Sequence, residues 1–381
     1  MTFSRRKTLA LIGGGSIAAA TGAVAFEVTR MPRTANAPWG AAGGYDDPRM
    51  RALSWAILAP NPHNMQPWLV DLRTADEATL YVDQDRMLPH TDPFNRQITI
   101  GLGCFLEVLR MAALEDGYDA QVDLFPDGAD DAALDSRPVA RIRFVVSDVE
   151  PDPLFEQVPY RRSLKEPFDM ARPVPEQALT ALEASVLPGT DVGTSSAPEF
   201  VETFRAMTRE ALRIELVTPR TFKESVDVMR IGARATDRTP DGIDLNGPMI
   251  EFARLAGQMT PDKLMDPTTM SFQQGMEAVL ANTDSAMAYV WITTRANTRA
   301  DQIRTGANWV RVNLAATAQG LGLQPLSQLL QEYPEMADLY AQTHERLAPN
   351  GGTVQMLCRL GYGPDVPASP RWPIDAKVLN A

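Results

Sequence analysis

The chain has 381 residues, enough for two domains or for one large domain with insertions. Hydrophobic residues make up 44% and charged residues 22%, which excludes a disordered chain and a protein with many membrane spans. Because 48 acidic residues outnumber 36 basic ones, the net charge of −12 disfavours nucleic acid as a partner. The two cysteines and three histidines share no metal-ligand spacing, so we expect no metal site.

The N-terminus has the pattern of an export signal. Arg5 and Arg6 precede an uncharged stretch, residues 9–26, that is rich in Ala and Gly. A permanent membrane span normally uses stronger hydrophobes over about 20 residues, whereas an arginine pair before a mildly apolar region is typical of a twin-arginine signal. The alternatives are an uncleaved anchor and a basic terminus without a targeting role.

Two cleavage positions fit this signal, one after Ala25 and one after the Ala35-Asn36-Ala37 triplet. We expect residues 1–37 to hold the signal and a linker, and the mature protein to be periplasmic or otherwise exported, with no stable membrane span after processing. The twin-arginine route carries folded proteins, which suits a protein that loads a cofactor before export.

Residues 38–150 predict a first α+β unit. A linker rich in Gly, Ala and Pro at 38–48 leads into a helix that the prolines of the following loop terminate. The apolar patterns then predict these elements: helices at 49–58 and 98–115, and strands at 69–72, 79–82, 121–125 and 140–146.

Residues 151–381 predict a second unit, in which helical patterns dominate to about residue 345. Helices are expected at 176–185 and 309–318, and a strand-like segment at 351–362. Residues 188–300 read as a helical insertion rich in methionine. Within them, residues 229–287 hold seven of the 17 methionines, at positions 229, 249, 259, 265, 270, 276 and 287. Methionine commonly fills irregular core gaps, which favours packing, and a soft lid over a flat ligand is the alternative.

The cysteines, Cys104 and Cys358, each sit in an apolar run. They could pair in an oxidising compartment, but the surroundings favour two separate buried thiols.

Several catalytic motifs are missing. The chain has no GxSxG, HExxH, CxxC, P-loop or GxGxxG pattern, which leaves serine hydrolases, zinc proteases and dinucleotide-binding Rossmann domains without support. Loops rich in amides and arginine remain, and these suit an organic cofactor that carries the reaction itself.

The loop at residues 59–68 reads Ala-Pro-Asn-Pro-His-Asn-Met-Gln-Pro-Trp. It resembles the flavin-contacting loop of the FMN-dependent nitroreductase family. The amides of Asn64 and Gln66 offer donors and acceptors for the polar edge of a flavin ring or for the ribityl hydroxyls. The alternative, a capped helix end with a buried tryptophan, explains the prolines but not both amides.

The segment that begins Arg161-Arg162-Ser163 resembles the family motif that grips the FMN phosphate, and guanidinium pairs bind phosphate bidentately. Here the motif follows the amide loop in the same chain. This order resembles the Acg-like branch, whose two related halves mimic a dimer in one polypeptide. The resemblance implies an α+β, nitroreductase-like fold with two tandem halves forming an intramolecular pseudo-dimer. A solvated basic turn is the alternative for the arginine pair alone.

Two C-terminal stretches extend the resemblance. Pro325, Leu326 and Ser327 follow a Gly-Leu-Gly turn that is similar to the family loop beside flavin N5, and Arg371 lies in an SPR-like ending that adds a basic residue to the phosphate site. A commonplace turn and a surface arginine are the alternatives. Asn61, Glu166 and Trp372 depart from the branch pattern, which predicts a weaker phosphate grip.

The resemblance implies an exported FMN-binding oxidoreductase that passes two electrons by a ping-pong cycle to a nitroaromatic or quinone-like acceptor. The chemistry is assigned to FMN, so no side chain is expected to be catalytic, and the donor is unknown. A flavin-sequestering protein without turnover is the alternative, and a protein that keeps the fold without flavin is a third reading. We expect a monomer or a weak homodimer, because one chain supplies both halves of the site.

Overall fold

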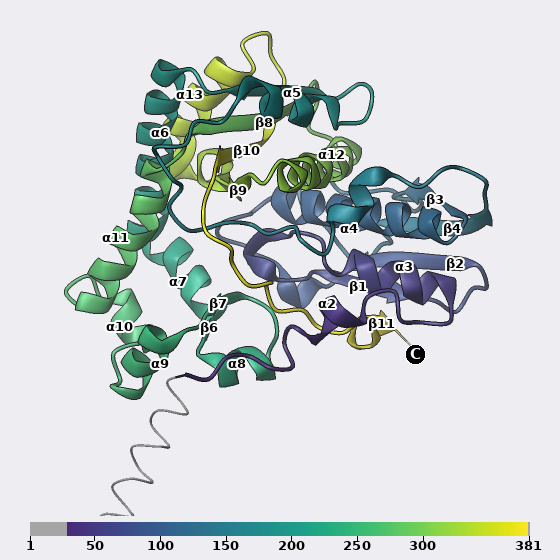
Figure 1. Ribbon diagram of the computed structural model, residues 1–381, viewed down its shortest axis with the longest axis horizontal. Coiled ribbons are helices and arrows are strands. Elements are labelled where there is room, and N and C mark those ends of the chain that lie inside the picture. The colour runs from purple at the N-terminus through teal and green to yellow at the C-terminus, as the bar shows by residue number, and fades with distance from the viewer. Residues whose placement is uncertain (1–28, 380–381) are drawn as a thin grey trace, which may run out of the picture.

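The computed structural model describes residues 29–379, so the expected signal at residues 1–28 lies outside the described part of the chain. Two mainly antiparallel sheets lie on either side of a pair of long helices (Figure 1). The class is α+β, as the sequence predicts.

The first sheet has the order β11-β1-β2-β4-β3. Its strands are β1 Trp68–Asp71, β2 Glu77–Val82, β3 Tyr118–Leu124, β4 Ala140–Val146 and β11 Val378–Leu379. In β2 every second side chain is buried, which is the alternation of a strand with one face on the core. The last strand, β11, pairs in parallel with β1, so the C-terminus of the chain completes the sheet of the first half.

The second sheet has the order β5-β8-β10-β9, and its central strand β10 is buried along almost its whole length. Its strands are β5 Asp191–Ser195, β8 Ala288–Thr294, β9 Gly322–Pro325 and β10 Thr353–Gly361. A separate parallel ribbon joins β6 Met229–Ile231 to β7 Ile243–Leu245.

Helices make up most of the remaining regular structure. The α-helices are α2 Ala37–Ala41, α3 Pro48–Ala56, α4 Arg96–Glu115, α5 Glu176–Ala184, α6 Pro198–Val217, α7 Pro219–Asp227, α8 Ala233–Arg238, α9 Pro248–Leu255, α10 Pro261–Met265, α11 Met270–Asp284, α12 Arg299–Ala318 and α13 Ala337–Leu347. Short 3-10 turns are η1 Pro62–Asn64, η2 Gln84–Arg86, η3 Pro153–Gln157, η4 Ser327–Leu330, η5 Pro334–Met336 and η6 Ile374–Ala376.

Helices α4 and α12 meet at two glycines in a reciprocal arrangement. A Cβ atom on Gly103 would lie 2.1 Å from the carbonyl oxygen of Ile303, and a Cβ on Gly306 would lie 2.0 Å from that of Ile100. Each glycine therefore rests on the carbonyl three residues before the other, within an Ile-x-x-Gly sequence present in both helices. The contact also brings the Cys104 thiol to 3.1 Å from the Gly306 carbonyl, to which it donates.

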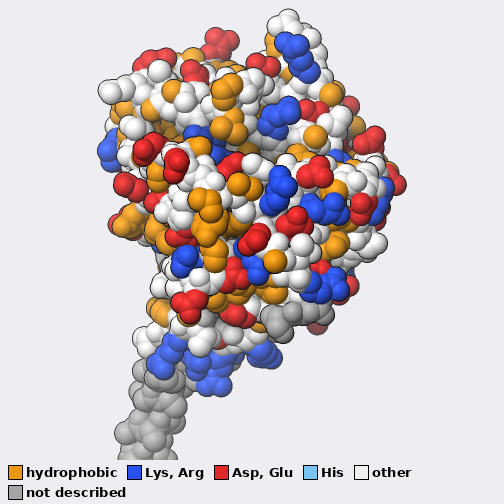
Figure 2. Space-filling model, turned by 90° about the vertical axis from the view of Figure 1, so that its right-hand side faces the viewer, with side chains coloured by type: hydrophobic (Ala, Val, Ile, Leu, Met, Phe, Trp, Pro, Cys, Tyr) orange, Lys and Arg blue, Asp and Glu red, His pale blue; other side chains and the backbone are white. Residues whose placement is uncertain are grey.

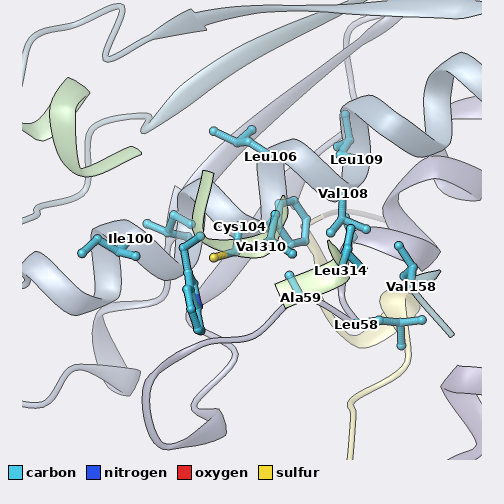
Figure 3. Packing of buried hydrophobic residues seen from close by; sticks show 14 of the residues in the cluster. Leu58, Ala59, Ile100, Cys104, Leu106, Val108, Leu109, Val158, Val310 and Leu314 are labelled. Atoms are coloured by element: carbon cyan, nitrogen blue, oxygen red, sulfur yellow. The ribbon is translucent and has the colours of Figure 1, made fainter. Parts of the chain in front are cut away.

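One hydrophobic core runs through both halves. It joins side chains of α4 and α12 to the end of α3, where Leu58 and Ala59 enter the amide loop (Figure 3). Within residues 29–379, α4 alone combines the length and hydropathy of a membrane span, and 89% of that span is buried inside the protein. Its apolar character therefore serves the core.

The strands and helices predicted for the first half are confirmed, with bounds shifted by a few residues. The linker predicted at 38–48 is wrong in part, because α2 begins there and Pro38 is buried. The helical reading of the second half missed strands β5 to β9. Of these, β5 has no buried side chain, β6, β7 and β9 have three or four residues each, and β8 is longer and mostly buried. Helix α12 begins ten residues before its predicted start, at a capping box that Thr298 forms with Asp301.

Both cysteines are free and buried, as the apolar runs predict. Of the seven clustered methionines, Met249 and Met270 are exposed. The other five are partly buried against hydrophobic clusters, which confirms packing as their role.

Charges of both signs are intermixed on the face drawn in Figure 2, and a group of basic side chains lies beside the point where the described chain begins.

Candidate functional site

The amide loop, residues 59–68, has an unusual backbone. His63, Asn64 and Gln66 have φ angles of 47°, 54° and 52°, a region that residues other than glycine seldom adopt. The side-chain oxygen of Asn61 accepts the Gln66 N–H at 2.7 Å across the turn. Such strain persists only where the surroundings hold it, which is common at binding sites.

The Gln66 side chain is fully buried and ties distant segments to the loop. Its Oε1 accepts the backbone N–H of Trp372 at 2.9 Å, and its Nε2 donates to the Pro240 carbonyl at 2.8 Å. The buried ammonium of Lys377 donates to the Gln66 carbonyl at 2.9 Å. The amide is thus occupied by protein groups, and this geometry favours a structural role over the flavin contact predicted for Gln66.

Asn64 is similarly committed. Its Nδ2 donates to the Pro370 carbonyl at 3.0 Å, and its Oδ1 accepts a hydrogen bond from the Arg371 guanidinium. Asn64 therefore orients Arg371, and one N–H of its amide remains for a ligand.

Arg371 is 2% exposed and directs all five of its side-chain N–H groups at oxygen atoms of the protein. The acceptors are the carbonyls of Ile57, Leu58, Ala59 and Pro370 and the side chain of Asn64. The direct phosphate contact predicted for Arg371 has no free donor in this geometry. Its positive charge stays in the site, and its hydrogen bonds hold the start of the amide loop.

Arg161 and Arg162 keep N–H donors that have no partner in the part of the chain that the structure describes. One N–H of buried Arg161 reaches the Leu58 carbonyl at 3.0 Å, the same oxygen that Arg371 contacts. Arg162 donates to the carbonyls of Pro159 and Arg161, while its buried Nε has no partner among the described residues. The structure thus brings the amide loop and the arginine pair together, as the sequence predicts.

These three residues, Arg161, Arg162 and Arg371, form the arginine cluster, and none of them has a carboxylate partner within residues 29–379. Burial and the charges of neighbouring arginines lower the pKa of Arg371 to about 9 and that of Arg161 to about 10. Burial also lowers the pKa of Arg162. All three stay protonated at neutral pH, so the cluster carries positive charge that an anion would stabilise.

His63 lies in the amide loop and was not singled out as a site residue by the sequence. Burial, with a smaller contribution from the charge of Lys165, lowers the pKa of His63 to about 4. Its Nδ1 is buried without a partner among the described residues. A neutral imidazole with an unused nitrogen can donate or accept one hydrogen bond to a ligand.

Residues 325–327, the stretch predicted to pass beside flavin N5, follow the edge strand of the second sheet, β9. The Leu323 carbonyl in β9 accepts the Leu164 N–H at 2.9 Å, which joins this strand to the segment after the half-buried Ser163. Pro325 has no N–H, and that of Leu326 donates to the Leu357 carbonyl at 2.8 Å.

The side chain of Leu326 is packed in a hydrophobic cluster. Of the three predicted residues, Ser327 alone keeps an N–H without a partner among the described residues.

Part of the predicted insertion, residues 188–300, is hydrogen-bonded to the amide loop. In the middle turn, residues 239–242, the N–H of Gly242 donates to the Asn64 carbonyl at 3.1 Å. The neighbouring Asp241 is 1% exposed and forms ion pairs with Arg86 and Arg230. It also accepts the indole N–H of Trp372 at 2.7 Å.

The cluster of contacts around Asp241 was not predicted, because its members are spread over residues 86–372. Trp39 was also missed. Its ring lies over Arg162 and Arg371, although Trp39 itself belongs to the segment predicted as a linker. In the sequence, a single tryptophan among Gly and Ala residues was the signal that could have indicated this role.

No group of three metal-ligating side chains lies within the described residues. A cavity of about 640 Å³ lies elsewhere, between α4, α12 and η3. Its Arg311 already pairs with Glu107 and Asp152, so the charge there is balanced. The arginine cluster remains the stronger candidate for binding an anion.

No protein-family model matches the chain. Among curated proteins, it is similar to Acg of Mycobacterium tuberculosis, described as a candidate NAD(P)H nitroreductase. The two are 26% identical over 337 residues, which are 85% of this chain and 93% of the relative. A second protein of that organism with the same description is 25% identical over 334 residues, covering 86% of this chain and 88% of its own.

Solved structures that resemble this one include the FMN-dependent nitroreductase NfnB of Mycobacterium smegmatis, with a TM-score of 0.35, 17% identity and coverage of 59% of this chain and 96% of that one. A candidate nitroreductase of Anabaena variabilis covers 90% of this chain and 91% of its own, with a TM-score of 0.41 and 12% identity. The sequence matches to the curated proteins extend along most of each chain. The chain is therefore similar to the Acg-type proteins described as nitroreductases, in agreement with the resemblance that the amide loop and the arginine pair indicate.

Proposed function

We propose that this protein is an exported FMN-binding oxidoreductase of nitroreductase type, acting on a nitroaromatic or quinone-like acceptor. The observation that carries the proposal is the arginine cluster, three cations without a carboxylate partner within the described residues. An anionic group of the ligand would supply the missing negative charge. The relationship to Acg supports the same reading.

The described residues fit an FMN molecule. Arg161 and Arg162 supply uncommitted N–H donors for its phosphate, and the partnerless Nε of Arg162 and Nδ1 of His63 supply further hydrogen-bonding atoms. FMN would contribute two-electron transfer between a donor and an acceptor that bind in turn. The protein's own groups bind and orient it, with Arg371 adding positive charge and Asn64 fixing the position of Arg371.

The curated relatives are described as NAD(P)H nitroreductases, which makes NADPH the first electron donor to test. Purified protein should carry flavin absorbance, bleach with NADPH or dithionite, and regain its colour when a nitroarene is added. Wild-type protein that binds no added FMN would contradict the proposal.

Phosphate recognition can be tested separately by comparing FMN with riboflavin. Arg162→Ala should weaken FMN binding by about tenfold or more, the value of one lost charge-assisted contact, and leave riboflavin binding nearly unchanged. Arg346→Ala, which removes the same charge at an exposed position of α13, serves as the control. If Arg162→Ala weakened the binding of FMN and riboflavin equally, Arg162 would not contact the phosphate.

The second candidate function is flavin sequestration without turnover. It is favoured by the middle turn, which is hydrogen-bonded to the amide loop: the Pro240 carbonyl accepts from Gln66, and the Gly242 N–H donates to the Asn64 carbonyl. A segment held in this way would cover a ligand bound at the loop. Reduction by dithionite without any acceptor turnover would support this candidate over the oxidoreductase.

A further inference from the structure

Residues 30–39 lie against the folded body and form what we call the strap. Asp237 of α8 anchors it, since one carboxylate oxygen accepts the backbone N–H groups of Arg33, Thr34 and Ala35 at 2.8, 2.9 and 3.1 Å. The Thr34 hydroxyl donates to the same oxygen, and Arg30 pairs with the carboxylate at 3.9 Å. Although partial burial acts in the opposite direction, these donors hold the pKa of Asp237 below its ordinary value. The carboxylate is therefore charged at neutral pH.

The centre of the strap is buried. Ala35 is 1% exposed, and its carbonyl accepts the backbone N–H of Arg371 at 2.8 Å. The strap thus contacts the C-terminal segment at the residue that organises the amide loop.

The end of the strap reaches the arginine cluster. The ring of Trp39 lies 4.7 Å from the guanidinium carbon of Arg162 and 5.5 Å from that of Arg371. Its indole N–H donates to the Ser369 carbonyl at 2.8 Å, which fixes the ring in this position. An aromatic face at these distances stabilises a cation and restricts the rotamers of both arginine side chains.

We propose that the strap is a permanent part of the mature protein and a wall of the arginine site, so that any export processing removes only residues before Arg30. The wall part of this proposal rests on the proposed function, whereas the retention of the strap does not. Of the two cleavage positions that the sequence leaves open, the one after Ala37 is then not used.

Cleavage after Ala37 would remove the three N–H donors of Asp237 and the acceptor of the Arg371 N–H. It would also place a new cationic amino group on Pro38, directly before Trp39, whose ring lies close to Arg162 and Arg371, two cations that already repel each other. A protease would in addition have to reach Ala35, which is buried.

The direct test is the mass of the intact protein purified from its native compartment. We expect a first residue at or before Arg30, such as Phe26. A mature protein that begins at Pro38 would overturn the proposal. Two full-length variants give a matched comparison: Ala37→Tyr, at an exposed position, should leave processing unchanged, whereas Ala25→Tyr should alter it.

The strap's contribution to folding is tested with full-length Asp237→Ala in the absence of flavin. The variant should unfold at a temperature several degrees lower, because the strap loses its common acceptor. Asp237→Asn keeps an oxygen acceptor and should lose less. Equal midpoints for Asp237→Ala and the wild type would contradict the anchoring role.

The wall is tested by full-length Trp39→Leu, with FMN as the probe. Removing the aromatic face should weaken FMN binding by about tenfold, whereas Trp39→Phe should retain most of the affinity. Unchanged affinity in Trp39→Leu would overturn the wall. If the wild-type protein binds no FMN, the proposed function fails, and the intact mass and the Asp237 variants still decide whether the strap is retained.

Discussion

Arg371 shows how a residue predicted to bind a ligand can instead build the site. The sequence places it in an ending similar to a phosphate-binding motif, and the structure brings it to the arginine cluster. Yet its guanidinium is saturated by oxygens of the protein. A sequence motif predicts the neighbourhood of an arginine, whereas the hydrogen-bond count decides which N–H groups a ligand can use.

Replacing Arg371 with lysine should therefore destabilise the fold. Lysine has three N–H donors on one nitrogen and cannot reach five oxygens in a plane, so buried carbonyls lose their partners. We expect the free energy of unfolding to fall by about 3 kcal/mol in urea titrations. Arg73→Lys, in an exposed ion pair with Asp71, should change it by less than about 0.5 kcal/mol. If Arg371→Lys changed the free energy of unfolding as little, Arg371 would not be holding the start of the amide loop in place.

Binding of inorganic phosphate or FMN should weaken as the pH rises from 7 to 9. Burial, with the charge of Arg86, lowers the pKa of Lys377 to about 8, so positive charge is lost beside the amide loop in this window. Because this pKa lies below the unfolded one, Lys377 makes the ligand-free protein more stable as the pH rises, and unfolding would not explain the loss. Calorimetric titrations at each pH measure the effect, and a constant affinity would refute it.

At the scale of elements, α4 and α12 hold the two halves together through reciprocal glycine contacts. Both glycines stand where the opposing backbone leaves no space for a Cβ atom. The shared Ile-x-x-Gly sequence and the matching lengths of the helices, 20 residues each, are what a pair of related halves would leave at their junction. The pseudo-dimer itself stays a prediction.

Gly306→Ala should destabilise the protein by about 2 kcal/mol or more, because the added methyl group meets the Ile100 carbonyl and the helices must separate. Gly275→Ala provides the control. Gly275 lies in helix α11 with no atom near its would-be Cβ, and alanine should stabilise that helix by about 1 kcal/mol. Thermal unfolding of both variants distinguishes steric conflict from helix propensity, and equal shifts would refute the close contact.

The elements that the sequence predicted well are those whose burial follows their periodicity. Strand β2 alternates, and α4 is apolar over five turns. Strand β5 has no fully buried side chain, and β9 has a single one, so neither has a pattern to detect. Helix α2 is five residues long, has a proline in its first turn and is followed by Ala and Gly residues, a composition that by itself is typical of a linker.

For the whole molecule, the site is assembled from segments that the chain order separates widely. The amide loop and the arginine pair were predicted because each resembles a motif by itself. The strap, the middle turn and Lys377 were not, because their contribution depends on contacts across more than a hundred residues. The net charge of −12 likewise gave no sign of three neighbouring arginines that have no carboxylate partner within residues 29–379.

Because one chain supplies both the amide loop and the arginine cluster, we expect one flavin per polypeptide in a protein that needs no partner subunit. Ultracentrifugation with detection at a flavin absorbance wavelength should give a monomer with about one FMN bound. Two flavins per chain, or binding only in a dimer, would contradict a single composite site.

The return of the C-terminal segment to the first sheet has a consequence for biosynthesis. Residues 370–379 hold Arg371, Lys377 and β11, all of which complete structures begun by residues 57–71. A ribosome therefore makes the last part of the binding site only after the helices and strands of both halves. While the intervening residues 72–369 are being made, the nascent chain has the amide loop without Arg371 and Lys377, so it cannot hold a ligand as the folded protein does.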